Sequence, residues 1–230
     1  MDDVASVVAQ GSSAEVSRLL RSLSADPSKA RKVLADLSSD SRAEVRGWVP
    51  FAARKVLGRQ AVPYLVALAR DRNPGVSDVA LEELLDLEPE AAKTLIKLIR
   101  AKLRSKDPQE SIFAMWTLAQ LGDRDSIDAI RRLSELSEFP FQRRAAEVVL
   151  LLLDAKIDGI LGRIRQHDHE YMRDLAHAAM LAGGHEALEA VKECAENAPD
   201  ADCRHYCQWN LSQPPVRRVA SSGPAGSRKI

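Results

Sequence analysis

The chain has 230 residues, and its 33 Lys and Arg residues balance its 33 Asp and Glu residues. This zero net charge excludes a strong overall attraction to nucleic acid or to an anionic membrane, so any electrostatic function has to come from local patterns. Aromatic residues make up only 4% of the sequence, which suits thin layers of helices rather than a wide core. The longest strongly apolar run covers residues 148–153, far short of a membrane span.

The N-terminal segment shows no targeting sequence. Met1-Asp2-Asp3 is acidic where a secretory signal would be basic, and no long apolar stretch follows. The three cysteines lie within residues 194–207 and, being odd in number, do not make a disulfide framework. We therefore expect a reduced, cytoplasmic protein. We expect residues 1–37 to form degenerate helices that cap the N-terminal end of the following segment.

A short motif recurs along the rest of the chain. A Leu-Gly pair closes an apolar stretch at Leu57-Gly58 and again at Leu121-Gly122. The same place is held by three further pairs, so that the successive intervals are 30, 34, 32 and 29 residues: Leu87-Glu88, Leu153-Asp154 and Ala182-Gly183. Intervals of this length are typical of helical-repeat proteins, in which each repeat buries its apolar face against its neighbours.

Each repeat has the pattern of two amphipathic helices. In the fourth repeat, apolar residues spaced by three and four mark one helix and then a second: Ala145, Val148, Val149 and Leu152, followed by Ile157, Ile160, Leu161 and Ile164. Asn73-Pro74 and Asp107-Pro108 fit helix starts, because Pro lacks an N–H and the preceding side chain accepts from exposed amides. Gly58 and Gly122 fit the left-handed residue that ends a helix. Because no strand-like alternation occurs, we expect an all-α fold.

These residues resemble the HEAT repeat, and in particular the short bacterial type found in bilin-lyase-like proteins. The resemblance rests on Val45-Arg46, on Leu57-Gly58, on the segment 61–65 (Ala-Val-Pro-Tyr-Leu) and on Asp107-Pro108 with Leu121-Gly122-Asp123. It covers residues 38–211, about five to six repeats. It implies a right-handed α-solenoid of antiparallel helix pairs, a HEAT-like or ARM-type superhelix. The motif is specific for fold and nearly silent on function.

Two rows of charged residues are the strongest surface signal. In HEAT-like arrays the second helices of the pairs line the concave surface that binds partners, and both rows fall on predicted second helices. A basic row and an acidic row each follow helical spacing: Lys93, Lys97, Arg100 and Arg104; Glu186, Glu189, Glu193 and Glu196. We expect them to orient a protein partner of complementary charge. The alternative is that they are ordinary solvated helix faces.

Two groups of residues have the types that bind metals. Cys203 and Cys207 lie one helical turn apart and Cys194 is upstream, but His205 is rotated by about 200° from Cys203 and faces elsewhere. The alternative is that these cysteines pack as small apolar residues. One HEAT-repeat family, the deoxyhypusine hydroxylases, binds iron through His-Glu pairs in equivalent repeats. His169-Glu170 and His185-Glu186 are out of that register. We expect no metal and no cofactor.

Two enzymatic alternatives remain open. HEAT-like proteins include DNA glycosylases, which use exposed aromatic residues beside a carboxylate, and enzymes that attach or remove bilins. Trp116 has apolar neighbours that favour core packing, and Trp48 has a more exposed context. Zero net charge disfavours nucleic-acid binding. Because the usual catalytic motifs are absent, we expect a non-catalytic scaffold or adaptor that binds a protein. Residues 212–230 have the composition of a disordered basic tail, and the sequence leaves the oligomeric state open.

Overall fold

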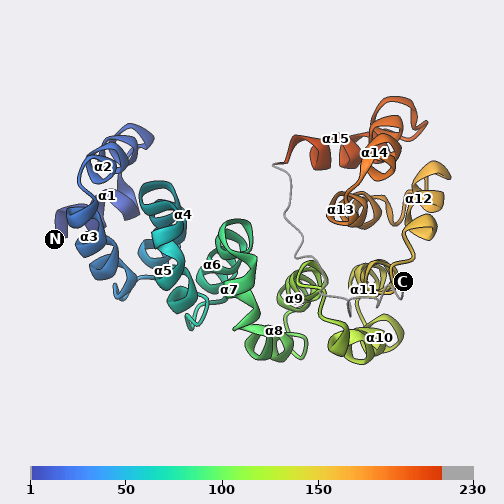
Figure 1. Cartoon of the computed structure of the whole chain (residues 1–230), viewed down its shortest axis with the longest axis horizontal. Coiled ribbons are helices and arrows are strands. Elements are labelled where there is room, and N and C mark those ends of the chain that lie inside the picture. The colour runs from blue at the N-terminus through green and yellow to red at the C-terminus, as the bar shows by residue number, and fades with distance from the viewer. Residues whose placement is uncertain (1, 214–230) are drawn as a thin grey trace, which may run out of the picture. The chain divides into compact units, whose positions relative to one another are not determined.

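The computed structural model describes residues 2–213, with side chains from residue 4 onward, and these residues form helices and connections without any strand (Figure 1). The prediction of an all-α fold is therefore confirmed for this part of the chain. The predicted tail lies outside it apart from Ser212 and Gln213. Within the same residues, no helix combines the length and apolar character that a membrane span requires.

The chain divides into two compact units, Met1–Leu95 and Ile96–Ile230. The boundary falls inside the predicted repeat array, between the two charged residues Lys93 and Lys97. We call these parts unit 1 and unit 2.

Unit 1 consists of two rows of helices. In one row α2 packs against α4 and α4 against α6, and in the other α3 packs against α5 and α5 against α7. Successive helices along the chain also pack together, which joins the rows. The bounds are α1 (Asp2–Gln10), α2 (Ser13–Ala25), α3 (Pro27–Ser38), α4 (Ala43–Leu57), α5 (Val62–Leu68), α6 (Pro74–Leu87) and α7 (Pro89–Lys93), with a 3-10 turn at Gly58–Ala61.

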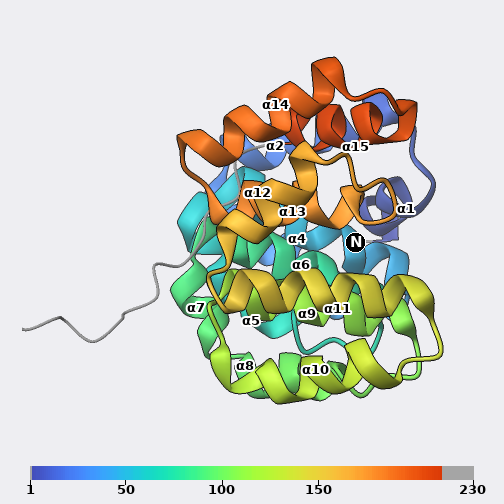
Figure 2. The ribbon, with the colours of Figure 1, turned by 90° about the vertical axis from the view of Figure 1, so that its right-hand side faces the viewer.

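Unit 2 shows the same plan (Figure 2). Helices α9, α11, α13 and α15 form one row in which each packs against the next. Helices α8, α10, α12 and α14 lie on the other side, each packed against the helix that follows it. The bounds are α8 (Ile96–Lys102), α9 (Pro108–Gln120), α10 (Ile127–Leu136), α11 (Pro140–Leu153), α12 (Ile157–Arg165), α13 (Met172–Ala182), α14 (His185–Asn197) and α15 (Ala201–Ser212), with a 3-10 turn at Arg124–Ser126.

The helix ends follow from local chemistry that the sequence predicts. The Asn73 side chain accepts from the Val76 N–H at the start of α6, and Asp107 accepts from the Gln109 N–H at the start of α9. Gly58 closes α4 with a positive φ of 54°, a backbone conformation that favours glycine. These predicted starts and stops are confirmed.

One turn recurs before four of the helices, α4, α6, α9 and α11. In each case an Asp or Ser side chain accepts a hydrogen bond from the backbone N–H two residues further on, with donor–acceptor distances of 2.8–3.1 Å. We call it the pre-helix turn, and it occurs at Asp40, Asp71, Ser105 and Ser137. The spacings are 31, 34 and 32 residues. The repetition seen in the sequence is thus also present in the hydrogen bonds.

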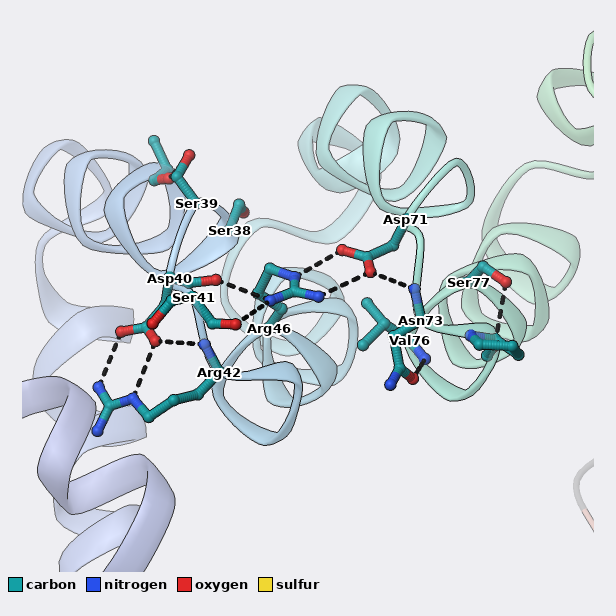
Figure 3. A network of polar contacts seen from close by, with 12 residues as sticks. Ser38, Ser39, Asp40, Ser41, Arg42, Arg46, Asp71, Asn73, Val76 and Ser77 are labelled. Atoms are coloured by element: carbon teal, nitrogen blue, oxygen red, sulfur yellow. Dashed lines mark hydrogen bonds and ion pairs between the residues drawn. The ribbon is translucent and has the colours of Figure 1, made fainter.

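A second recurring device is an arginine at the fourth position after the residue that caps the helix. Arg46, Arg143 and Arg204 each donate back to carbonyl groups of the segment that precedes their own helix. Arg46 donates to Asp40 O at 2.8 Å and to Ser41 O at 3.0 Å (Figure 3). The guanidinium therefore satisfies carbonyls that no helix pairs, and it fixes how the connection enters the helix.

Arg46 has a further partner. Its guanidinium forms a two-point ion pair with the Asp71 carboxylate from the next pre-helix turn, at 2.6 and 2.9 Å (Figure 3). Both side chains are more than nine-tenths buried. The hydrogen bonds from Arg46 outweigh burial and hold the pKa of Asp71 below its ordinary value of 3.8. This ion pair fastens α4 to the connection that leads into α6.

Candidate functional site

The predicted basic row does not lie on one continuous helix. Helix α7 ends at Lys93, Thr94 and Leu95 form a turn, and α8 begins at Ile96. The prediction of a single helix through this segment is therefore wrong. Lys93 belongs to unit 1 and forms an ion pair with Glu90 at 2.9 Å, whereas the other three members belong to unit 2.

Arg100 forms more ion pairs than any other member of the basic row. Its guanidinium binds the buried carboxylate of Asp123 through two hydrogen bonds and contacts Asp125 at 3.0 Å. Burial alone would raise the pKa of Asp123, but the hydrogen bonds from Arg100 and Ser126 outweigh it and lower the pKa. Arg100 thus ties α8 to the connection before α10, and reversing its charge would disturb the fold as well as the surface.

The remaining basic side chains are open to solvent. Lys97 and Arg104 are exposed, and neither has an ion-pair partner among residues 4–213. Because no neighbour neutralises them, they carry the part of the predicted row that is accessible to a partner. Their role in binding stays a prediction.

The predicted acidic row lies along one exposed side of α14. Glu186 pairs with Arg165 at 3.0 Å, and Glu189 pairs with Lys192 at 3.0 Å. The hydrogen bond from Lys192 lowers the pKa of Glu189. Glu193 is exposed without an ion-pair partner in the described part of the chain. The row therefore retains net negative charge, and its role in binding also stays a prediction.

In unit 2 the continuous row consists of the first helices of the pairs. Successive contacts run from α9 through α11 and α13 to α15, whereas among the second helices the extensive contact is between α12 and α14. Figure 1 shows α9, α11, α13 and α15 on the inner side of the bend that unit 2 makes. The second helices, which the HEAT resemblance assigns to the concave surface, lie on its outer side.

The inner row of unit 2 carries a cluster of aromatic and ionisable side chains. Trp116 of α9 and His177 of α13 meet edge to face, with ring centroids 4.7 Å apart. Burial lowers the pKa of His177 to about 4, against the opposing effect of a hydrogen bond with Asn210 of α15. Trp116 is half-buried rather than part of the core, although its neighbours Met115 and Ala119 are fully buried. We call Trp116, His177 and Asp174 the inner cluster.

Asp174 lies one turn before His177 on α13 and is half-buried. Burial raises its pKa to about 6, and the positive charges of Arg173 and Arg144 only partly oppose that effect. Asp174 and His177 are therefore both shifted toward their neutral forms at the same place on the inner row. Such shifts are commoner at functional sites than elsewhere, although structural networks also produce them.

A second surface feature lies at the connection between α10 and α11. Leu136 is 75% exposed, Phe139 41% and Phe141 37%, and the two phenyl rings lie 5.7 Å apart. We call these three residues the apolar corner. Only three other large apolar side chains are exposed among the described residues, and each of them stands in a different helix: Phe51, Leu188 and Trp209. Nothing in the sequence spacing of Phe139 and Phe141 indicates this exposure.

The histidines and cysteines with metal-ligand chemistry do not converge in a group of three or more among the described residues. Among the described residues, no group of three or more His, Cys, Asp and Glu side chains is arranged to hold a metal ion. His169-Glu170 lies in the connection between α12 and α13, whereas His185-Glu186 begins α14. Cys194, Cys203 and Cys207 are buried and unbonded.

Comparison with known proteins adds no relative. No protein-family model matches the chain, and no curated protein matches its sequence.

Proposed function

We propose that residues 38–211 form a HEAT-like, right-handed α-solenoid of antiparallel helix pairs. The support is the repetition itself: the pre-helix turn occurs four times, and an arginine four positions after the cap donates backward in α4, α11 and α15. Two rows of helices within each unit fit the same architecture. Stacked repeats expose long surfaces relative to their mass, which suits them to binding.

On this architecture we propose a non-catalytic cytoplasmic scaffold or adaptor that binds a protein partner. The apolar corner is the observation that carries the proposal. Phe139 and Phe141 expose neighbouring rings and the exposed Leu136 lies three residues before Phe139, whereas the other exposed large apolar side chains stand on other helices. Aromatic residues dominate the energetics of protein interfaces, and contiguous exposed apolar surface marks such interfaces. Burial of this corner by a partner would remove it from water.

The charged rows give the proposal its second part. Lys97 and Arg104 are exposed cations without ion-pair partners among the described residues, and Glu193 is the corresponding anion on α14. Charges at the edge of an interface act mainly on the association rate and on specificity. We therefore assign affinity to the apolar corner and steering to the two rows.

The test is capture of partners from the native lysate with a tagged chain, compared across variants. The triple variant Leu136→Ser, Phe139→Ser, Phe141→Ser should lose a stoichiometric protein partner. The matched control is Leu188→Ser, which removes a similarly exposed apolar side chain on α14. Equal recovery of the partner by both variants would refute the assignment of the corner, provided that circular dichroism shows both to be helical.

The steering assignment needs a separate variant. The double variant Lys97→Glu, Arg104→Glu should slow association with the partner. It should also reduce the salt dependence of the association rate, because exposed charges are screened within about 8 Å at physiological ionic strength. Arg100 is left unchanged because its ion pair with Asp123 is structural. The control is Arg18→Glu with Arg21→Glu, which reverses two exposed charges of α2. Unchanged association of the first variant would remove these residues from the site.

A HEAT-like enzyme, of the DNA-glycosylase type or the bilin lyase and isomerase type, is a second candidate. The inner cluster favours it, because the half-buried Trp116 meets His177, and the pKa values of His177 and of Asp174 one helical turn before it are both displaced. The test is release of base from alkylated duplex DNA and transfer of a bilin to an acceptor protein, each with wild type and Asp174→Asn. Absence of turnover with both substrates in the wild type would dismiss this candidate.

A further inference from the structure

Two cysteine sulfurs meet between the last two described helices. Cys194 lies on α14 and Cys207 on α15, and these helices pack against each other. The Cys207 Sγ is 2.7 Å from the Cys194 Sγ, within about 0.7 Å of a disulfide bond length. Both side chains are buried, with 2% and 0% exposed. The sequence spacing alone gives no reason to pair these two.

The third cysteine contacts the pair only through its backbone oxygen, which lies 3.7 Å from the Cys194 Sγ. Cys203 is on the same helix as Cys207, but its Sγ contacts the backbone oxygen of His167 at 3.9 Å and no other sulfur. The Met172 Sδ of α13 lies 3.6 Å from each member of the pair. Since a thioether forms no disulfide, the geometry singles out Cys194 and Cys207.

We infer that Cys194 and Cys207 form a peroxide-oxidisable dithiol, which closes to an intramolecular disulfide and fastens α15 to α14. The two sulfurs already lie near bonding distance on neighbouring helices, so closure requires only a small movement. The loop closed by the bond contains 12 residues between the two cysteines.

Cys194 is the sulfur that reacts first. The Cys207 S–H donates to the Cys194 sulfur, which lowers the pKa of Cys194, while the same contact raises the pKa of Cys207. The Cys194 thiolate attacks one oxygen of hydrogen peroxide, forming an S–O bond, breaking the O–O bond and releasing hydroxide. The product is a sulfenic acid.

The second step closes the bond. The Cys207 sulfur attacks the Cys194 sulfur, the S–S bond forms, the S–O bond breaks, and the departing hydroxyl leaves as water with the Cys207 proton. Each of the two sulfurs loses one electron in total, and the peroxide is reduced to water. Because both thiols are buried, the oxidant reaches them when α15 opens locally. The extensive contacts of α15 are those with α13 and α14.

The test uses the full chain, reduced, desalted and exposed to hydrogen peroxide, then alkylated in denaturant. The expected product is a monomer about 2 Da lighter in which one cysteine alone is alkylated. Its melting temperature should rise by about 5–10 °C and return to its first value with dithiothreitol.

The linkage can be mapped in the wild-type chain. Trypsin leaves Cys194 and Cys203 in one peptide, but cleavage before Asp200 and Asp202 separates them. We expect a peptide pair joining Cys194 to Cys207. A Cys203–Cys207 linkage, a product that is only an intermolecular dimer, or three alkylatable cysteines after treatment would each overturn the inference. Cys203→Ser should still close the bond, and Cys194→Ser should not.

Discussion

The pre-helix turns at Asp40 and Ser137 have the same hydrogen-bond pattern, but the residues around them have different roles. In both, a side chain accepts from the N–H two residues on, and an arginine four positions after the cap donates back to the preceding carbonyls. Around the first turn Arg46 continues into a buried ion pair with Asp71. Around the second, Phe139 and Phe141 face solvent. The repeat scaffold and the surface that it displays are thus encoded by different residues.

The largest expected effect comes from the buried ion pair of the first turn. Arg46→Ala should lower the free energy of unfolding by about 3–5 kcal/mol, because the Asp71 carboxylate stays buried without its cation. Denaturant unfolding followed by circular dichroism measures this. Arg46→Met combined with Asp71→Leu is the control and should recover part of the loss. A loss below about 1 kcal/mol for Arg46→Ala would show that the pair contributes little.

The equivalent arginine of the second turn should matter less. Arg143 donates to the Ser137 carbonyl, and no Asp or Glu forms an ion pair with it among the described residues. Arg143→Ala should therefore cost about 1.5–3 kcal/mol, the range for hydrogen bonds from charged groups. The same unfolding experiment measures it. If the loss equals that of Arg46→Ala, the contrast between the two turns is mistaken.

The two turns should also differ in their response to acid. The Asp71 pKa is lower in the folded chain than its ordinary 3.8, so the unfolded carboxyl takes up a proton first as the pH falls. The stabilisation that the ionised Asp71 carboxylate contributes is present above pH 3.8 and is lost as the pH falls through the depressed pKa. Asp71→Asn should remove that part of the acid sensitivity, whereas Ser137→Ala should leave it unchanged. Unfolding free energies measured from pH 6 downward compare them, and parallel curves for Asp71→Asn and wild type would count against the ion pair.

The smallest effect on stability is expected at the apolar corner. Replacing Leu136, Phe139 or Phe141 by serine should change the free energy of unfolding by no more than about 0.5 kcal/mol each, because exposed side chains contribute little to folding. Thermal unfolding of the single variants provides the measurement. A substantial loss of stability would mean that the corner packs in the fold and is not displayed for a partner.

The sequence predicted helices and their ends well, because capping and glycine conformation are local. Asn73 and Asp107 cap as expected, and Gly58 adopts the positive φ that its place requires. The break at Thr94 was missed, because the spacing of apolar residues continues through it. There the backbone N–H groups of Thr94 and Leu95 bond three residues back instead of four, which tightens the chain and ends the helix.

The surface was harder to predict than the fold. Periodicity assigned Trp116 to the core, because α9 is apolar nearly all round and its spacing does not say which apolar residue lies at the edge. Phe139 and Phe141 have the residue type of a core, and nothing in their spacing shows that solvent surrounds them. The ion pair between Arg100 and Asp123 joins residues 23 positions apart in the sequence. A pattern along one helix does not reveal such a contact.

Site-specific photo-crosslinking in the native cell tests the central claim most directly. A photoreactive benzoylphenylalanine is placed at Phe139 in one chain and at Leu188 in another, and covalent adducts are identified by mass spectrometry. An adaptor that binds through the apolar corner should give one abundant protein adduct from position 139 and little from position 188. The absence of any adduct from position 139, or equal adducts from both positions, would contradict the account.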